Sequence, residues 1–142
     1  FPTRRSSDLM LVASQKHPFA KKKYFDLAHL SDEKFIFRER GSGTRMSTDA
    51  HFKRLQFKPN VRLELGSNEA IKQAVLGGLG LAVLSKYSLG DESDRENSLA
   101  ILKCREFPID SSWHIVSHQG KKLSPIAAVF KKHLSEQAKL WL

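Results

Sequence analysis

The stretch VRLELGSNEAIKQAVLGGLGLAVLS, residues 61–85, has the pattern of a strand, a helix and a second strand. Its first five residues alternate apolar and charged side chains, which is typical of a strand with one covered face. Ser67 is a favourable helix N-cap, and the apolar spacing over residues 70–75 predicts a helix that Gly77 ends. Residues 79–84 are almost continuously apolar, which predicts a strand buried on both faces of a parallel sheet.

The residues before this stretch continue the alternation of strands and helices. A short β-prone run, FIF at residues 35–37, leads into the glycine turn GSGTR at residues 41–45. We expect Thr44 to cap a helix over about residues 45–56. The expected apolar stripe of this helix is imperfect and consists of Met46, Ala50, Phe52 and Leu55. The order strand, helix, strand, helix, strand predicts an α/β lobe with right-handed crossovers.

Shorter elements flank this lobe. The pair His17-Pro18 predicts an extended, non-helical connection, and Ser124-Pro125 predicts the start of a final helix with an apolar stripe that needs a partner. The remaining expectations are a strand at 10–14, a helical turn at 26–30, a polar loop at 91–97, and strands at 99–102 and 113–117.

Composition indicates an ordinary globular protein. The chain has 142 residues, of which 40% are hydrophobic and 27% charged, enough for one domain or for one lobe with parts of another. The apolar runs are too short to span a bilayer, and Cys104 is the only cysteine, so no internal disulfide can form. We therefore expect a soluble, cytoplasmic protein with no membrane partner.

The first nine residues, FPTRRSSDL, resemble a translated sequencing adapter, and we leave residues 1–9 out of the fold as an expected scar. We expect the natural protein to extend upstream. The formal charge of +9 falls to +8 when the two arginines and one aspartate of this segment are removed. The remaining basic residues are scattered and accompany no nucleic-acid motif, so we interpret them as mostly solvated faces.

The glycine turns predict a binding site for an anion. Ligands of open parallel sheets bind at the carboxyl ends of the strands, where the first turns of the following helices expose N–H groups. Glycines permit close approach, hydroxyls can donate, Arg45 offers a two-pronged cation, and helix N-termini favour negative charge. The candidate ligand-binding residues are Ser42, Gly43, Thr44, Arg45, Ser67, Asn68 and Ser85. The alternative is that these residues form only turns and helix caps.

No pattern indicates an enzyme, a metal site or a cofactor. The turn lacks the Gly-Lys-Ser/Thr of a phosphate loop and the spacing of a dinucleotide site. The six histidines are dispersed, and His114 and His118 are too far apart on an extended strand to share a metal easily. Cys104 has no motif around it, so we expect an unreactive thiol.

Three segments together resemble one family. FIFRERGSGTR, FKPNVRLELGSNEAIKQAVLGGLGLAVLS and WHIVSHQGKKLSPIAAVFKKHL, taken in this order, resemble the effector-binding domain of LysR-type transcriptional regulators, especially the branch that controls carbon-fixation (RuBisCO) operons. The resemblance implies a fold like that of type-2 periplasmic binding proteins, with one complete Rossmann-like lobe and part of a second. Residues 18–112 would form the complete lobe, lobe II, while residues 10–17 and 113–142 would belong to lobe I as crossover strands and a C-terminal helix.

The same resemblance implies a function. The chain would bind a small anionic metabolite, such as a phosphorylated one, in a cleft between the lobes, and would thereby modulate transcription. DNA would be bound only through an N-terminal helix-turn-helix domain outside this sequence, and the full-length protein would form dimers or tetramers. Two alternatives remain at this point: a periplasmic solute-binding protein of the same architecture, favoured by an upstream signal peptide, and an enzyme on this fold.

Overall fold

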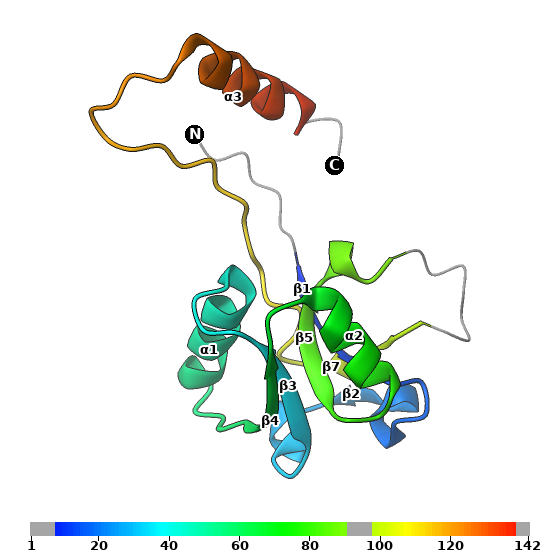
Figure 1. Cartoon of the computed structure of the whole chain (residues 1–142). Helices are drawn as coiled ribbons and strands as arrows, with labels where there is room; N and C mark the ends of the chain where they lie inside the picture. Colours follow the sequence, from blue (N-terminus) through cyan, green and yellow to red (C-terminus); the bar gives the residue numbers. More distant parts are fainter. Residues whose placement is uncertain (1–7, 91–97, 139–142) are drawn as a thin grey trace. The chain divides into compact units, whose positions relative to one another are not determined.

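The computed structural model describes residues 8–90 and 98–138 of the chain (Figure 1). It contains two compact units, one covering residues 7–110 and the other including residues 111–142. The expected polar loop at residues 91–97 and most of the expected scar lie outside the described residues. Among the described helices, none is long and apolar enough to cross a membrane.

The larger unit is built on a five-stranded sheet with the order β4-β3-β5-β1-β6 (Figure 1). Its core consists of β3 (Lys34–Arg38), β4 (Asn60–Leu65) and β5 (Leu81–Ser85), and β3 pairs in parallel with both others. This confirms the parallel sheet expected from the sequence. Two further strands complete the sheet: β1 (Leu9–Ala13), antiparallel to β5, and β6 (Ala100–Ile101).

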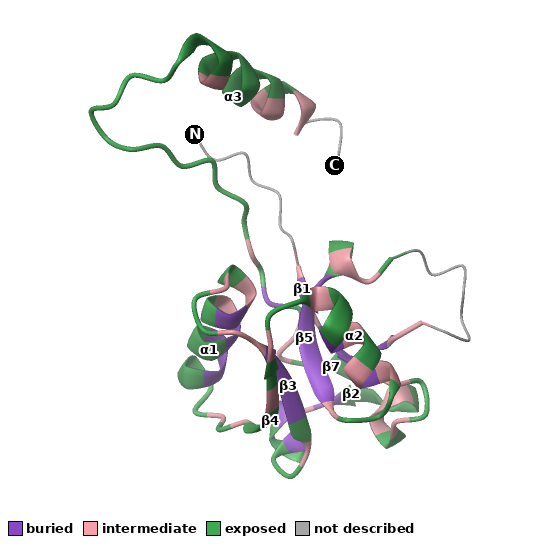
Figure 2. Cartoon of the chain, viewed as in Figure 1, coloured by how far each residue is buried: buried purple, intermediate pink, exposed green. Residues whose placement is uncertain are grey.

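Two helices cover opposite faces of this sheet. On one face, Phe35 and Phe37 of β3 pack with Phe52 of α1 (Gly43–Arg54). On the other face, Ile36 packs with Ile71 of α2 (Asn68–Leu76). Because neighbouring residues of a strand point to opposite faces, one apolar strand serves both layers. All five residues of β5 are buried, which confirms the strand predicted to be covered on both sides (Figure 2).

A second, smaller sheet and three short 3-10 turns complete the larger unit. A two-stranded parallel sheet pairs β2 (Lys23–Phe25) with β7 (Lys103–Cys104). Short 3-10 turns form η1 (Pro18–Lys21), η2 (Leu27–Leu30) and η3 (Lys86–Ser88). The expected helical turn at 26–30 corresponds to η2, and the expected strand at 99–102 is shorter than predicted.

Two expectations about α1 were wrong. Its N-cap is Ser42 and not Thr44, because the Ser42 hydroxyl accepts the backbone N–H of Arg45 at 2.9 Å. Its buried face is also not the predicted apolar stripe, since Met46 is 63% exposed and Leu55 is 39% exposed. Of the predicted stripe only Phe52 is buried, and the inward face is completed by Arg45, Thr48 and His51. Polar side chains can occupy such positions because each has hydrogen-bond partners there.

The second unit contains the predicted final helix. This helix, α3 (Pro125–Gln137), begins with proline and is capped by the Ser124 hydroxyl, which accepts the N–H of Ala127 at 3.2 Å. The strand expected at 113–117 is absent: none of these residues belongs to a strand, and Trp113 is 70% exposed. A strand needs a hydrogen-bonded neighbour, and no strand is described within residues 111–138 that could serve as one.

Candidate functional site

The two glycine turns lie at the same edge of the sheet. The last residues of β3 and β4, Arg38 and Leu65, are Cα partners in the parallel ladder, so both strands end side by side. The turn after β3 leads into α1, and the turn after β4 leads into α2 (Figure 1). This confirms that the two turns share one edge, which we call the carboxyl edge and define by the ends of β3, β4 and β5 with the turns that follow them.

Serine side chains fix the first turns of both helices. The Ser42 hydroxyl caps α1, and the Ser67 hydroxyl accepts the N–H of Ala70 at 3.3 Å at the start of α2. Among the described residues, no hydrogen bond satisfies the N–H groups of Gly43 and Thr44, or the Thr44 hydroxyl. The carboxyl edge therefore presents donors at the positive end of a helix dipole, where an anion is stabilised.

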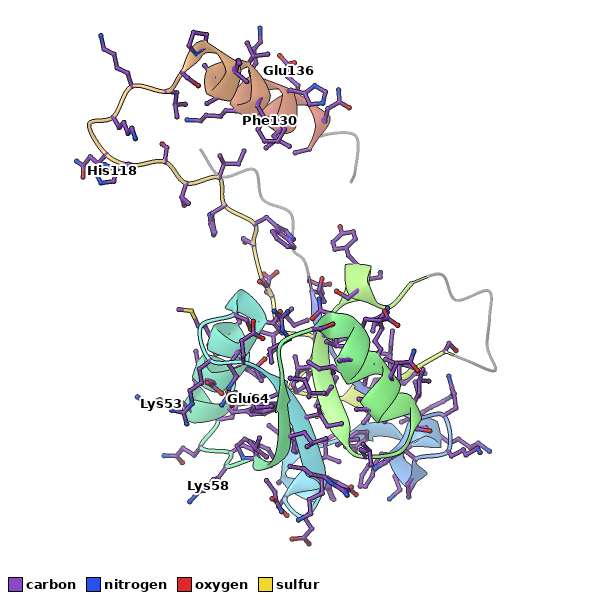
Figure 3. All side chains as sticks on the ribbon, in the orientation of Figure 1. Lys53, Lys58, Glu64, His118, Phe130 and Glu136 are labelled. Atoms are coloured by element: carbon purple, nitrogen blue, oxygen red, sulfur yellow. The ribbon has the colours of Figure 1, made fainter. Side chains whose placement is uncertain are left out.

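Two donors of the Arg45 guanidinium, Nε and Nη1, are already bonded to other groups of the chain. Its Nε donates to both carboxylate oxygens of Asp49, at 3.0 and 2.9 Å. Its Nη1 donates to Glu64 Oε2 and to the Arg38 carbonyl oxygen, both at 2.8 Å. The guanidinium carbon also lies 4.9 Å from the centre of the Phe37 ring. Arg45 thus ties the glycine turn to β3 and β4, and Glu64 on β4 lies beside α1 (Figure 3).

Arg38 is a second guanidinium at this edge and was not among the candidates expected from the sequence. Its Nη1 donates to Asn68 Oδ1 at 2.8 Å, and Asn68 Nδ2 donates to Ser88 Oγ at 3.2 Å. This chain of contacts joins the end of β3, the start of α2 and the turn after β5. Its sequence signal was weak, because Arg38 stands among charged residues that also suit a solvated surface.

The Ser85 hydroxyl has a distinctive environment. Ser85 ends β5 and is 9% exposed, and its Oγ atom is buried without a hydrogen-bond partner among the described residues. It also precedes η3, but its side chain makes no capping hydrogen bond there. Buried hydroxyls are nearly always hydrogen-bonded in native proteins, so the Ser85 hydroxyl remains able to bond a group outside the described residues.

Ion pairing keeps the carboxylates around this edge charged. The hydrogen bond from Arg38 lowers the pKa of Glu39, and the hydrogen bond from Arg45 lowers the pKa of Glu64. Both carboxylates are therefore ionised at neutral pH, when each balances the arginine that it contacts.

Among residues 8–90 and 98–138, no three His, Cys, Asp or Glu side chains are placed to hold a metal ion. Cys104 is buried and donates to Glu106 Oε2 at 3.1 Å. Burial, with a smaller effect of this carboxylate, raises the pKa of the Cys104 thiol to about 12, which agrees with an unreactive cysteine.

Comparison with known families gives one match that covers nearly the whole chain. The family described as "LysR substrate binding domain" matches residues 5–139. The transcriptional activator CmpR of Synechocystis sp. is 44% identical over 126 residues, which are 89% of this chain and 41% of that protein. The RuBisCO operon transcriptional regulator of Acidithiobacillus ferrooxidans is 40% identical, over 89% of this chain and 40% of its own length. The chain thus spans about two fifths of these relatives.

A solved structure gives a similar result. The regulatory domain of CcmR from Synechocystis PCC6803, in complex with 2-PG, has a TM-score of 0.84 and 45% sequence identity. The alignment covers 93% of this chain and 63% of that chain. The similarity confirms the expected fold class, the α/β fold of type-2 periplasmic binding proteins.

Proposed function

Because the chain belongs to the LysR substrate-binding-domain family, we propose that it is the effector-sensing part of a transcriptional regulator and that it binds a small anionic metabolite. The relatives named above are transcriptional regulators and not enzymes, which supports a function without catalysis. The same relatives disfavour the alternative of a transporter's solute-binding protein.

One observation supports the carboxyl edge as the binding site. The buried Ser85 hydroxyl, which lacks a described partner, lies at the end of β5 on the edge where α1 and α2 begin. Two helix N-termini and an unsatisfied hydroxyl at one edge suit a ligand with negatively charged oxygens. The proposed ligand-binding residues are those expected from the sequence: Ser42, Gly43, Thr44, Arg45, Ser67, Asn68 and Ser85.

These residues have different roles in the proposal. The N–H groups of Gly43 and Thr44 and the hydroxyls of Thr44 and Ser85 would contact the ligand directly. Arg45 would contribute positive charge and hold the turn, because Asp49 and Glu64 already accept hydrogen bonds from its Nε and Nη1. An effector bound here would favour one arrangement of the domain over another and so change how the regulator acts on a promoter.

The proposal extends to the rest of the regulator. Residues 18–112 would form lobe II, and residues 10–17 and 113–142 would be parts of lobe I. DNA would be contacted by a separate N-terminal domain, and the full-length protein would work in the cytoplasm as a dimer or tetramer. The complex of the CcmR regulatory domain makes 2-PG a suitable first ligand to test.

The test is a titration of 2-PG into the 142-residue chain by calorimetry. Gly43→Ala adds a methyl group where no atom lies within 4 Å of the new Cβ, so the fold should tolerate it while close approach of a ligand is hindered. Thr44→Val removes the free hydroxyl at nearly constant volume. Both variants should bind at least tenfold more weakly than the parent.

Gly77→Ala, at the opposite end of α2, is the matched control and should bind like the parent, since its new Cβ would lie 3.4 Å from the nearest atom. Circular dichroism would verify that each variant is folded. If Gly43→Ala and Thr44→Val both bind 2-PG as tightly as the parent chain does, the carboxyl edge is not the binding site.

A further inference from the structure

The two arginines of the carboxyl edge differ in how their charges are balanced. Arg45 contacts two carboxylates and a backbone carbonyl, and its side chain is only 9% exposed. Among the described residues, Arg38 contacts a single carboxylate, that of Glu39, through both Nε at 2.8 Å and Nη2 at 3.0 Å. The Glu39 carboxylate therefore accepts hydrogen bonds from both donors, Nε and Nη2, on one side of the Arg38 guanidinium.

The partner of Arg38 is easily displaced. Glu39 directly follows the last residue of β3, and its side chain is 45% exposed. Exposed ion pairs contribute little to stability, because water solvates both partners well. The Glu39 carboxylate can thus leave the guanidinium and become hydrated without disturbing the core.

The guanidinium itself remains in place without Glu39. Its third donor, Nη1, binds Asn68 Oδ1 at 2.8 Å, and Asn68 is held in turn by its contact with Ser88. The Arg38 side chain is 19% exposed, so its position is also limited by packing. Nε and Nη2 therefore stay directed toward the same place, beside the first residue of α2.

We propose that Arg38 is the exchangeable cation of the carboxyl edge, and that Glu39 competes with a carboxylate or phosphate group of the effector for its two-pronged face. This inference rests on the proposed function and adds a residue and an internal competitor to that site. Charge stays balanced in the exchange, because the guanidinium has one anionic partner before and after it. Two oxygens of either group match the spacing of Nε and Nη2.

Nuclear magnetic resonance of the arginine Nε–H groups can test the exchange directly in the 142-residue chain. We would titrate 2-PG, and in separate experiments inorganic phosphate and acetate, and follow Arg38 and Arg45. The Arg38 signal should move as the ligand replaces Glu39, and the Arg45 signal should move much less. Phosphate and acetate distinguish which of the two oxyanion groups is preferred.

Substitutions give an independent measure of the same competition, with 2-PG as the ligand. Arg38→Gln should weaken binding by about 30-fold, since it removes two charge-assisted hydrogen bonds. Glu39→Gln should strengthen binding by about threefold, since the competitor is an exposed ion pair. Glu69→Gln is the matched control, because Glu69 lies in the first turn of α2 but pairs with Lys72.

The combination of variants separates competition from a general effect of charge. In the Arg38→Gln background, Glu39→Gln should change binding no more than Glu69→Gln does. Equal strengthening by Glu39→Gln and Glu69→Gln in the parent, or an Arg38 signal that stays still while 2-PG binds, would overturn the inference and leave the proposed function intact. A parent chain that binds none of the three probes would contradict both.

Discussion

Arg45 and Glu64 form an ion pair, with 2.8 Å between Nη1 and Oε2, that joins the first turns of α1 to β4. The same Nη1 donates to the carbonyl oxygen of Arg38, so one side chain connects α1, β3 and β4. Because this arginine is nearly buried, its substitution removes a donor from one backbone carbonyl and from two carboxylates, those of Asp49 and Glu64.

Arg45→Met should therefore destabilise the chain by about 2 kcal/mol, measured as the free energy of unfolding in urea. Glu64→Gln should destabilise the chain less than Arg45→Met does, because the Glu64 side chain is 43% exposed. The amide oxygen of the new glutamine can also still accept a hydrogen bond from Arg45. The hydrogen bond from Arg45 lowers the pKa of Glu64, so its contribution is present at neutral pH and is lost as the pH falls below about 4.5. Equal stability of Arg45→Met and the parent would contradict the structural role of this arginine.

His51 should make stability depend on pH between about 5 and 7.5. Burial lowers the pKa of His51 below its usual value of about 6.5. Its Nε2 lies 2.8 Å from the Glu106 carbonyl oxygen, and its Nδ1 lies 2.8 Å from Arg54 Nη2. A carbonyl only accepts and a guanidinium only donates, so the neutral ring carries its proton on Nε2. A second proton would leave Nδ1 unable to accept and would place two cations in contact.

The unfolded chain therefore binds this proton more readily, and the free energy of unfolding should fall as the pH is lowered through about 6.5. One proton can change the free energy of unfolding by at most about 1.4 kcal/mol per pH unit. His51→Gln should flatten the dependence measured by urea unfolding at pH 7.5 and 5.0. The exposed His29, replaced in His29→Gln, provides the control, and an unchanged slope in His51→Gln would exclude His51 as the origin.

The thiol of Cys104 should react slowly in the folded chain. Its raised pKa of about 12 leaves almost no thiolate at pH 8, and the sulfur is buried. Alkylation by iodoacetamide at pH 8 should be at least a hundredfold slower than in 6 M urea, followed by mass spectrometry. Rapid native alkylation would show that β7 opens far more often than its packing indicates.

Gly80 tests how closely the loop before β5 approaches β3. A Cβ at this position would lie 2.6 Å from the Lys34 carbonyl oxygen and 3.3 Å from Ile36 Cγ1. Gly80→Ala should therefore destabilise the chain by about 2–3 kcal/mol in urea, because a backbone atom cannot easily move away. Gly66→Ala, with no atom within 4 Å of its new Cβ, should change stability by less than about 1 kcal/mol.

Local sequence patterns determine some features of this fold and not others. The alternation over residues 61–65 and the apolar run before Ser85 both predicted parallel strands correctly. The burial followed side-chain polarity in β5, whose five residues are all buried, but not fully in β4, where Val61 is 42% exposed. The two glycine turns were predicted to lie at one edge of the sheet, because parallel strands joined by helical crossovers have their carboxyl ends at the same edge. The inward face of α1 was missed because its polar side chains are satisfied by contacts that the linear pattern does not reveal, some as distant as that of His51 with Glu106.

The candidate site was predictable only in part. Glycine and serine spacing identified the turns, but the difference between Arg38 and Arg45 depends on three-dimensional contacts with Asn68, Asp49 and Glu64. Nothing in the linear sequence distinguishes a guanidinium with one carboxylate partner from one with two. The strand expected at residues 113–117 illustrates the same limit, since a β-prone segment forms a strand only beside a partner.

The apolar face of α3 should promote association of the 142-residue chain. Ile126, Val129 and Phe130 lie at helical spacing on one side of α3, and they are 84%, 69% and 59% exposed. An exposed face of this kind drives self-association when nothing covers it. Phe130→Lys should weaken association roughly 30-fold, since burying a phenylalanine side chain is worth about 2 kcal/mol. Sedimentation velocity over a range of concentrations would measure this. Ala128→Lys adds the same charge on another side of α3 and should have little effect, so equal weakening by both variants would point to charge repulsion instead of the apolar face.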